Sequence, residues 1–321
     1  MIKMKRLFLA AAFASTCAVA QPYPSKPLTL IVPFPPGGST DIIGRIAADG
    51  MARELGQPFV IDNRGGAGGA IGAKAIADAP PDGYTLGVAT ISTHVVNPTV
   101  QGDKLRYDPL RDFTLISQIA AVPNVLSLSP TVPARDMQEF IDYAKKNPGR
   151  LNFGSPGSGS LGHMIGETFK YSAKVDIVHV PYKGAGPALN DTLAGQVQVL
   201  FDNLPSSLPH IQSGKLRALA VASDKRVAAL AQVATFAELG MPLVNDPSWF
   251  GLIAPARLAP ETAARLHGAL LQALKQPEVL KRLESAAAAP VGNSPEAFRK
   301  LVSNSLDANR RTVREAGLKF D

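Results

Sequence analysis

The sequence predicts an α/β fold with two lobes and a ligand cleft between them. Short apolar runs alternate with helical patterns along most of the chain, which is typical of α/β proteins. Segments 119–124 and 240–248, punctuated by Pro, Gly or Asn, bracket a middle portion with its own strands and helices. Two Gly-rich turns, one in each proposed lobe, each follow a strand and open a helix. We therefore expect residues 21–122 and 246–321 to form one lobe and residues 123–245 the other.

The first strand and helix illustrate how the elements are assigned. Leu28–Val32 is a continuous apolar run, and Ile42, Ile43, Ile46 and Ala47 follow it at helical spacing. The same criteria predict strands at 28–32, 58–61, 85–89, 124–128, 151–154, 177–180, 197–201, 216–222 and 250–253. They predict helices at 41–55, 70–77, 137–145, 161–172, 187–193, 205–212, 260–274, 277–287 and 295–315. Each of the last three helices opens at or beside a proline, a residue favoured in the first helical turn.

Residues 1–20 have the features of a cleaved secretory signal. Three basic residues and no acid precede the apolar run Leu7–Val19, and Ala18-Val19-Ala20 has the small residues of a cleavage site. The run is too short to span a bilayer, and a buried N-terminal helix is the alternative interpretation. We expect a soluble, periplasmic mature protein that begins near Gln21.

Composition narrows the class of function. Residues 1–20 hold three of the 33 basic residues and none of the 26 acidic ones, so their removal leaves 301 residues with a net charge of +4. This excess is scattered, and no basic block is interleaved with aromatic residues, so nucleic acid is a poor candidate partner. Cys17 is the only cysteine and lies in the predicted signal. The mature chain therefore offers neither a disulfide framework nor thiolate chemistry.

The segment Pro33–Asp41 is the first candidate ligand turn. It lies between the predicted strand 28–32 and the predicted helix 41–55, and Gly37 and Gly38 would let the backbone approach a ligand closely. The first-turn amides of a helix carry a partial positive charge and lie at the carboxyl end of the preceding strand. This turn is therefore suited to binding a carboxylate or a phosphate.

A second turn, Gly154–Gly162, also joins a strand to a helix. It contains the pattern GxGxxG, but a dinucleotide site needs an acid at the end of the next strand, and Asp176 precedes that strand. A nicotinamide or flavin cofactor is therefore not expected. What remains is an anion-binding turn rich in hydroxyls, and two such turns in two lobes suggest a ligand held between them.

Other residues give weaker or ambiguous signals. The five histidines lack metal-binding spacing and no serine lies in a GxSxG elbow, so we expect no metal and no serine nucleophile. We interpret Gly65–Gly69 as close helix–strand packing. Asp41 could face a ligand, but pairing with Arg45 in the first helical turn is the preferred interpretation. Asp202 follows a strand at the same end as the cleft, where it could order water, bind an amine or simply hold a turn.

Motifs along the chain resemble the Bug, or TctC-like, solute receptors of tripartite tricarboxylate transporters. The resemblance rests on Pro24-x-Lys26-Pro27, Leu30-Ile31-Val32-Pro33-Phe34-x-x-Gly37-Gly38-x-Thr40-Asp41, Asp62-Asn63-Arg64-x-Gly66-Ala67-Gly68-Gly69, Pro80-x-Asp82-Gly83-Tyr84-Thr85-Leu86, Val180-Pro181-Tyr182-Lys183-Gly184 and Trp249-Phe250-Gly251-Leu252. It covers nearly all of the mature chain. It implies a type II periplasmic binding-protein fold with two α/β lobes around a central cleft.

In that family, the two turns hold carboxylates, partly through bridging waters. The ligand-binding residues that the resemblance implies are Phe34, Pro35, Gly37, Gly38, Ser39, Thr40, Ser92, Thr93, His94, Ser155, Gly157, Ser158, Ser160, Tyr182 and Asp202. Pro36 stands where many relatives have a small residue, and it removes one backbone donor from this turn.

The resemblance favours a non-catalytic, monomeric receptor for a small carboxylate such as a dicarboxylate, an amino acid or an aromatic acid. Its implied partners are TctA- and TctB-like membrane subunits, with a sensor kinase as the alternative. A secreted hydrolase or isomerase using Asp41, Asp202 and His94 is the rival hypothesis. An enzyme would need an activated nucleophile or an oriented base, and no spacing in this sequence supplies one.

Overall fold

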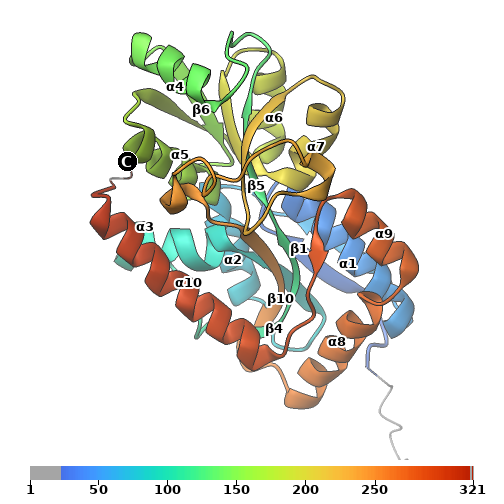
Figure 1. Ribbon diagram of the computed structural model, residues 1–321. Helices are drawn as coiled ribbons and strands as arrows, with labels where there is room; N and C mark the ends of the chain where they lie inside the picture. The colour runs from blue at the N-terminus through green and yellow to red at the C-terminus, as the bar shows by residue number, and fades with distance from the viewer. Residues whose placement is uncertain (1–22, 319, 321) are drawn as a thin grey trace, which may run out of the picture.

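The computed structural model describes residues 23–318 and residue 320, which form two α/β lobes, each built on its own sheet (Figure 1). The predicted signal at residues 1–20 lies outside the described residues. The fold class predicted from the sequence is confirmed, since both sheets are flanked by helices and the lobes meet at the centre of the molecule.

Lobe 1 is built on a six-stranded sheet with the order β11-β4-β10-β3-β1-β2. Strand β1 pairs in parallel with β2 and β3, while β10 runs antiparallel between β3 and β4. The strands are β1 (Leu28–Val32), β2 (Phe59–Asn63), β3 (Thr85–Thr90), β4 (Phe113–Val122), β10 (Ser248–Pro255) and β11 (Ala289–Pro290). The helices of this lobe are α1 (Ser39–Leu55), α2 (Ala70–Ala77), α3 (Asn97–Gln101), α8 (Pro260–Ala273), α9 (Pro277–Ser285) and α10 (Pro295–Glu315).

Lobe 2 is built on a five-stranded sheet with the order β7-β6-β8-β5-β9. Strand β6 pairs in parallel with β7 and β8, and β5 runs antiparallel to β8 and β9. The strands are β5 (Asn124–Leu128), β6 (Leu151–Ser155), β7 (Ile177–Pro181), β8 (Val199–Asn203) and β9 (Arg217–Ala222). The helices are α4 (Met137–Lys146), α5 (Leu161–Ala173), α6 (Ala185–Leu193) and α7 (Leu204–Gln212).

The chain passes between the two sheets at Pro123 and again between β9 and β10. Strand β4 continues to Val122 and β5 begins at Asn124, so the first crossing is much shorter than the segment 119–124 expected from the sequence. The side-chain amide of Asn124 donates to the carbonyl of Asp246 at 2.6 Å, which ties the two crossings together. The predicted lobe boundaries at 122/123 and 245/246 stay predictions.

Two elements near the cleft were not anticipated. Strand β4 was not predicted, because polar residues such as Thr114, Ser117 and Gln118 interrupt its apolar pattern. Both faces of this strand are nevertheless largely buried, because it lies inside the sheet between β10 and β11. The chain after β3 forms a π-helical turn, η2 (Ser92–Val96), that continues into α3. Helical bonding of this kind is rare and frequently occurs at functional sites.

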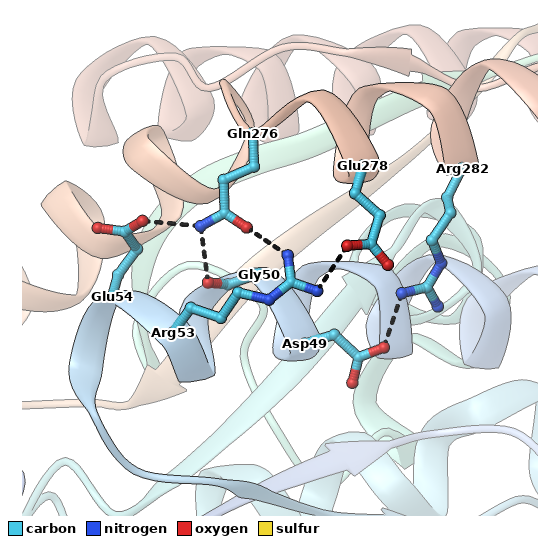
Figure 2. A network of polar contacts seen from close by, with 7 residues as sticks. All are labelled: Asp49, Gly50, Arg53, Glu54, Gln276, Glu278 and Arg282. Atoms are coloured by element: carbon cyan, nitrogen blue, oxygen red, sulfur yellow. Dashed lines mark hydrogen bonds and ion pairs between the residues drawn. The ribbon is translucent and has the colours of Figure 1, made fainter.

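Helices α8 and α9 pack against α1 through both apolar and polar contacts. A Cβ on Gly50 would lie 2.9 Å from Cβ of Ala273, so glycine permits the close approach of α1 and α8. Figure 2 shows the polar contacts beside this point: Arg53 donates to Gln276 at 2.8 Å and to Glu278 at 3.1 Å. These exposed pairs add little stability individually, so the buried apolar surface is the main attachment. No helix within residues 23–318 is long and apolar enough to cross a membrane.

Candidate functional site

The turn between β1 and α1 presents backbone amides at the carboxyl end of β1. Gly37 has a φ of 86°, which favours glycine, and Gly38 is the N-cap of α1 with an extended backbone. No side chain caps this helix, so its first-turn amides remain available to an acceptor at the cleft. The structure therefore forms the local geometry that the sequence predicted for this turn.

Asp41 stabilises the conformation of this turn through hydrogen bonds. Its carboxylate accepts from the amide of Gly37 at 3.1 Å, from Nε of Arg45 at 2.9 Å and from Nδ2 of Asn63 at 3.0 Å. The predicted pairing with Arg45 is confirmed. Burial by itself would raise the pKa of Asp41, but the hydrogen bonds from Arg45, Asn63 and Gly37 together lower it below its usual value.

We expect Asp41→Ala to destabilise the protein by about 1–3 kcal/mol near neutral pH, because the buried carboxylate accepts three hydrogen bonds and bonds to a charged group contribute more than neutral ones. The folded-state pKa of Asp41 is lowered, so its contribution is present above the unfolded pKa and is lost as the pH falls through the folded pKa. The difference between the variant and wild type should therefore shrink in strong acid. Urea unfolding near neutral pH and at about pH 3 tests this. A difference that grows on acidification would contradict it.

The second turn, between β6 and α5, is shaped by glycines and serines. Gly157 and Gly159 have φ values of 131° and 75°, and Ser160 caps α5 by accepting from the amide of His163 at 3.3 Å. The hydroxyl of Ser155 bonds Nε2 of His179 at 2.7 Å and accepts from the amide of Gly157 at 3.2 Å. These bonds fix the loop from within lobe 2.

The two lobes contact each other directly at these turns. Ser39 Oγ lies 2.8 Å from Ser206 Oγ and accepts from the amide of Ser206 at 3.1 Å. Ser92 Oγ accepts from the amide of Leu161, the first residue of α5, at 3.0 Å. A Cβ on Gly38 would lie 3.3 Å from Cβ of Ala185 in lobe 2. The lobes are therefore closed, and groups suited to a ligand satisfy one another across the cleft.

A cavity of about 20 Å³ remains between the lobes. It is lined by Phe34, Gly38, Ser39, Thr40, Thr90, Ser92, Asn124, Pro156, Leu161, Gly162, Ala185, Asp202, Asn203 and Ser248. Six of these residues were predicted from the sequence: Phe34, Gly38, Ser39, Thr40, Ser92 and Asp202. A volume of this size holds about one water molecule. Admission of a larger molecule therefore requires the lobes to separate.

Asp202 is the one carboxylate among the residues that line this cavity. Its oxygens accept from Ser206 Oγ at 2.5 Å, from Ser207 Oγ at 2.9 Å and from the amide of Asn203 at 2.8 Å. Burial raises its pKa, and these three hydrogen bonds offset only part of that effect. Because Ser206 also bonds Ser39 of lobe 1, Asp202 supports the contact that joins the lobes.

Some predicted site residues do not line the cavity: Pro35, Gly37, Thr93, His94, Ser155, Gly157, Ser158, Ser160 and Tyr182. His94 is fully buried, packs its ring on Phe113 and bonds Thr93 Oγ1 through Nδ1 at 2.9 Å. Burial lowers its pKa to about 3, so the imidazole is neutral. Tyr182 donates to Asp191 at 2.7 Å; burial and that carboxylate raise its pKa to about 12.

Pro35, Gly157 and Ser158 lie instead where the lobes touch. Pro35 packs between Gly65 and Gly184, because a Cβ on either glycine would come within 2.6 Å of its ring. A Cβ on Gly157 would lie 3.3 Å from the amide nitrogen of Gly68, and a Cβ on Gly68 would lie 2.5 Å from the carbonyl of Ser158. Packing between helix and strand was therefore an incomplete interpretation of Gly65–Gly69, since Gly68 contacts the opposite lobe.

The amide side chains of Asn124 and Asn203 line the cavity but were not among the ligand-binding residues that the resemblance implied. Nδ2 of Asn203 donates to Oδ1 of Asn124 at 2.7 Å, and both residues lie beside the crossings between the lobes. Asn203 directly follows Asp202, so the end of the predicted strand was a usable signal for it. Asn124 was seen only as punctuation at a crossing. Among the described residues, no group of three or more His, Cys, Asp or Glu is placed to hold a metal ion.

The chain matches the model of the tripartite tricarboxylate transporter family receptor over residues 43–318. Protein BugT of Bordetella pertussis (strain Tohama I) is 36% identical over 314 residues, which cover 98% of this chain and 96% of BugT.

Solved structures agree with this match. One described as a periplasmic transporter is 48% identical, with a TM-score of 0.91 and coverage of 93% of this chain and 100% of its own. R. palustris Rpa4515 with adipate is 37% identical, with a TM-score of 0.88 and coverage of 92% and 99%. MatC (Rpa3494) from Rhodopseudomonas palustris with bound malate is 33% identical, with a TM-score of 0.87 and coverage of 91% and 100%.

Proposed function

Because the chain belongs to the tripartite tricarboxylate transporter receptor family, we propose that it binds a small dicarboxylate between its lobes and delivers it to a membrane transporter. The family and its solved members are binding proteins of the periplasm, and two of those members hold the dicarboxylates adipate and malate. We propose that the chain binds and delivers its ligand and does not catalyse a reaction. TctA- and TctB-like membrane subunits are its proposed partners, and the signal at residues 1–20 is its proposed route to the periplasm.

The observation that carries the proposal is that helix N-termini from both lobes line the cavity. Gly38 and Ser39 open α1, while Leu161 and Gly162 open α5, and all four residues line the same space. Each helix end supplies about half a positive charge, together with amide donors that are uncapped in α1 and that opening of the lobes would free in α5. Two such ends on opposite walls suit a ligand with a carboxylate at each end. The described lining contains no Lys, Arg or His, so dipoles and hydroxyls would carry the binding.

The closed contacts suggest how the ligand is exchanged. Opening of the lobes would break the Ser39–Ser206 contact and the bond from the Leu161 amide to Ser92. Ligand carboxylates would then accept from the freed amide and hydroxyl donors, replacing one set of hydrogen bonds by another. Asp202 would repel a carboxylate placed beside it, so the ligand carboxylates should lie at the helix ends and away from this residue.

We expect titrations with adipate and malate to show binding that changes little between low salt and ~0.15 M salt, because enclosed dipoles are screened less than surface charges. The corresponding diamides should bind much more weakly, because they lack the negative charge that helix ends favour. Isothermal titration calorimetry measures both effects. Mass spectrometry of small molecules released from the purified protein would identify the ligand acquired in the cell. Diamides that bind as well as the acids would contradict the proposal.

A further inference from the structure

A second and larger pocket lies at the junction of the two lobes. Its volume is about 260 Å³, and both lobes, a crossing segment and the last helix contribute to it. It is lined by Ile91, Val95, Met164, Ile165, Thr168, Pro242, Leu243, Asn245, Asp246, Ser305, Ala308, Asn309 and Thr312. We call it the hinge pocket. It shares no residue with the lining of the ligand cavity.

The wall formed by α10 is one face of that helix. Ser305, Ala308, Asn309 and Thr312 are three or four residues apart, which places them on the same side. Helix α5 supplies Met164, Ile165 and Thr168 from lobe 2. In Figure 1 the far end of α10 runs toward lobe 2. Beyond this end, the ring of Phe320 meets that of His163 of α5 edge-on. The pocket is thus built where α10 reaches across the junction of the lobes.

The polar groups of the hinge pocket are mainly acceptors. Thr168 donates its hydroxyl proton to the carbonyl of Met164 at 2.8 Å, and Thr312 donates to that of Ala308 at 3.2 Å. Their oxygens are left with lone pairs only. Asn309 is 5% exposed, and its Oδ1 has neither accessible surface nor a hydrogen-bond partner among the described residues, so it does not take part in the ligand site.

The charge of the pocket is negative. Asp246 is an exposed residue whose carboxylate takes part in no ion pair or side-chain hydrogen bond within the described residues, and the described lining holds no Lys, Arg or His. Desolvation by surrounding atoms raises the pKa of this carboxyl to about 6, so it is ionised at mildly alkaline pH. The remaining walls are aliphatic, from Ile91, Val95, Ile165 and Leu243, the last of which is 47% exposed. A fitting ligand therefore has several donors, a positive charge and a short apolar part. An anion would meet a carboxylate with no compensating cation.

We propose that the hinge pocket binds a small primary ammonium ion with a short alkyl chain, whose ammonium group pairs with the carboxylate of Asp246. An ammonium group has three donors, which match the Asp246 carboxylate and the threonine oxygens. The alkyl chain lies against the aliphatic walls. This site is separate from the carboxylate cavity and would function whether or not that cavity binds the proposed dicarboxylate.

The test uses the full mature chain labelled with ¹³C at its methionine methyl groups, because Met164 lines the pocket. The probe is n-butylammonium chloride at mildly alkaline pH, with butanol and butyrate as matched neutral and anionic controls. We expect butylammonium to shift the Met164 signal, assigned with Met164→Leu, in a saturable manner. Butanol should act more weakly and butyrate should have no saturable effect. No saturable shift with butylammonium, or an equal one with butyrate, overturns the proposal.

Variants localise the effect. Asp246→Asn, which keeps the size of the side chain, should weaken butylammonium binding by about three- to fivefold, as expected for loss of an ion pair at an exposed carboxylate. Asp142→Asn, at an exposed acid of α4, should leave it unchanged. Ala308→Phe should fill the pocket and abolish the shift. Thermal melting identifies any variant that fails to fold. Asp246→Asn protein that is folded and still binds butylammonium as wild type does would overturn the role of Asp246.

Discussion

Replacing Gly38 by valine is expected to reduce carboxylate affinity by about 100-fold or more, equivalent to a loss of about 2.8 kcal/mol. Gly38 lines the cavity at the N-cap of α1, and even its Cβ would lie 3.3 Å from Ala185 of lobe 2. The branched side chain would occupy the space between the helix amides and the ligand and would hold the lobes apart. Calorimetric titration of the variant with adipate and malate measures the effect.

Two controls separate this effect from general damage. Gly268→Val adds the same side chain at an exposed position of α8 where no atom lies within 4 Å, so it should leave binding intact. Lys183→Ala removes a cation near the cleft and should matter much less than Gly38→Val, because the lining of the cavity does not include Lys183. If Lys183→Ala eliminates binding while Gly38→Val retains it, binding by helix ends is wrong.

Replacing Gly68 by valine is expected to prevent closure of the lobes and to lower ligand affinity by about tenfold or more, equivalent to about 1.4 kcal/mol. Gly68 does not line the cavity, but its Cβ would lie 2.5 Å from the carbonyl of Ser158 and 3.0 Å from the carbonyl carbon of Gly159. These are backbone atoms, which cannot move aside as a flexible side chain can, so the clash would keep the lobes apart. Small-angle scattering should show a variant that is more extended than the wild type, whose lobes close.

The matched control is Gly214→Val. Gly214 has a φ of 71° against 59° for Gly68, so valine is strained at both positions, but no atom lies within 4 Å of a Cβ on Gly214. Its effect should therefore be confined to stability. A Gly68→Val protein that is as compact as the wild type would exclude the contact with Ser158 as a requirement for closure.

Local patterns along the chain were sufficient to predict the fold class, most elements and the first ligand turn. The apolar run Leu28–Val32 forms β1, and the Gly-rich segment after it opens α1 with uncapped amides, because turn chemistry and helix capping depend on neighbouring residues. Asp41 was interpreted correctly for the same reason, since Arg45 is one helical turn away. The resemblance to the receptor family was also visible from the sequence, because it rests on short motifs of neighbouring residues.

Tertiary structure decided which of the expected residues line a common space. His94 follows a candidate ligand loop in the sequence, yet the π-helical turn at Ser92–Val96 directs its side chain into the core against Phe113. Asn124 and Ser248 gave no sequence signal of a ligand-binding role. They line the cavity because the two crossings between the lobes meet there. The sequence determined each turn by itself, because φ preferences, capping and helix dipoles are local. Contacts such as Ser39–Ser206 and Gly68–Ser158 join residues far apart in the chain, so only the docking of the two lobes could establish them.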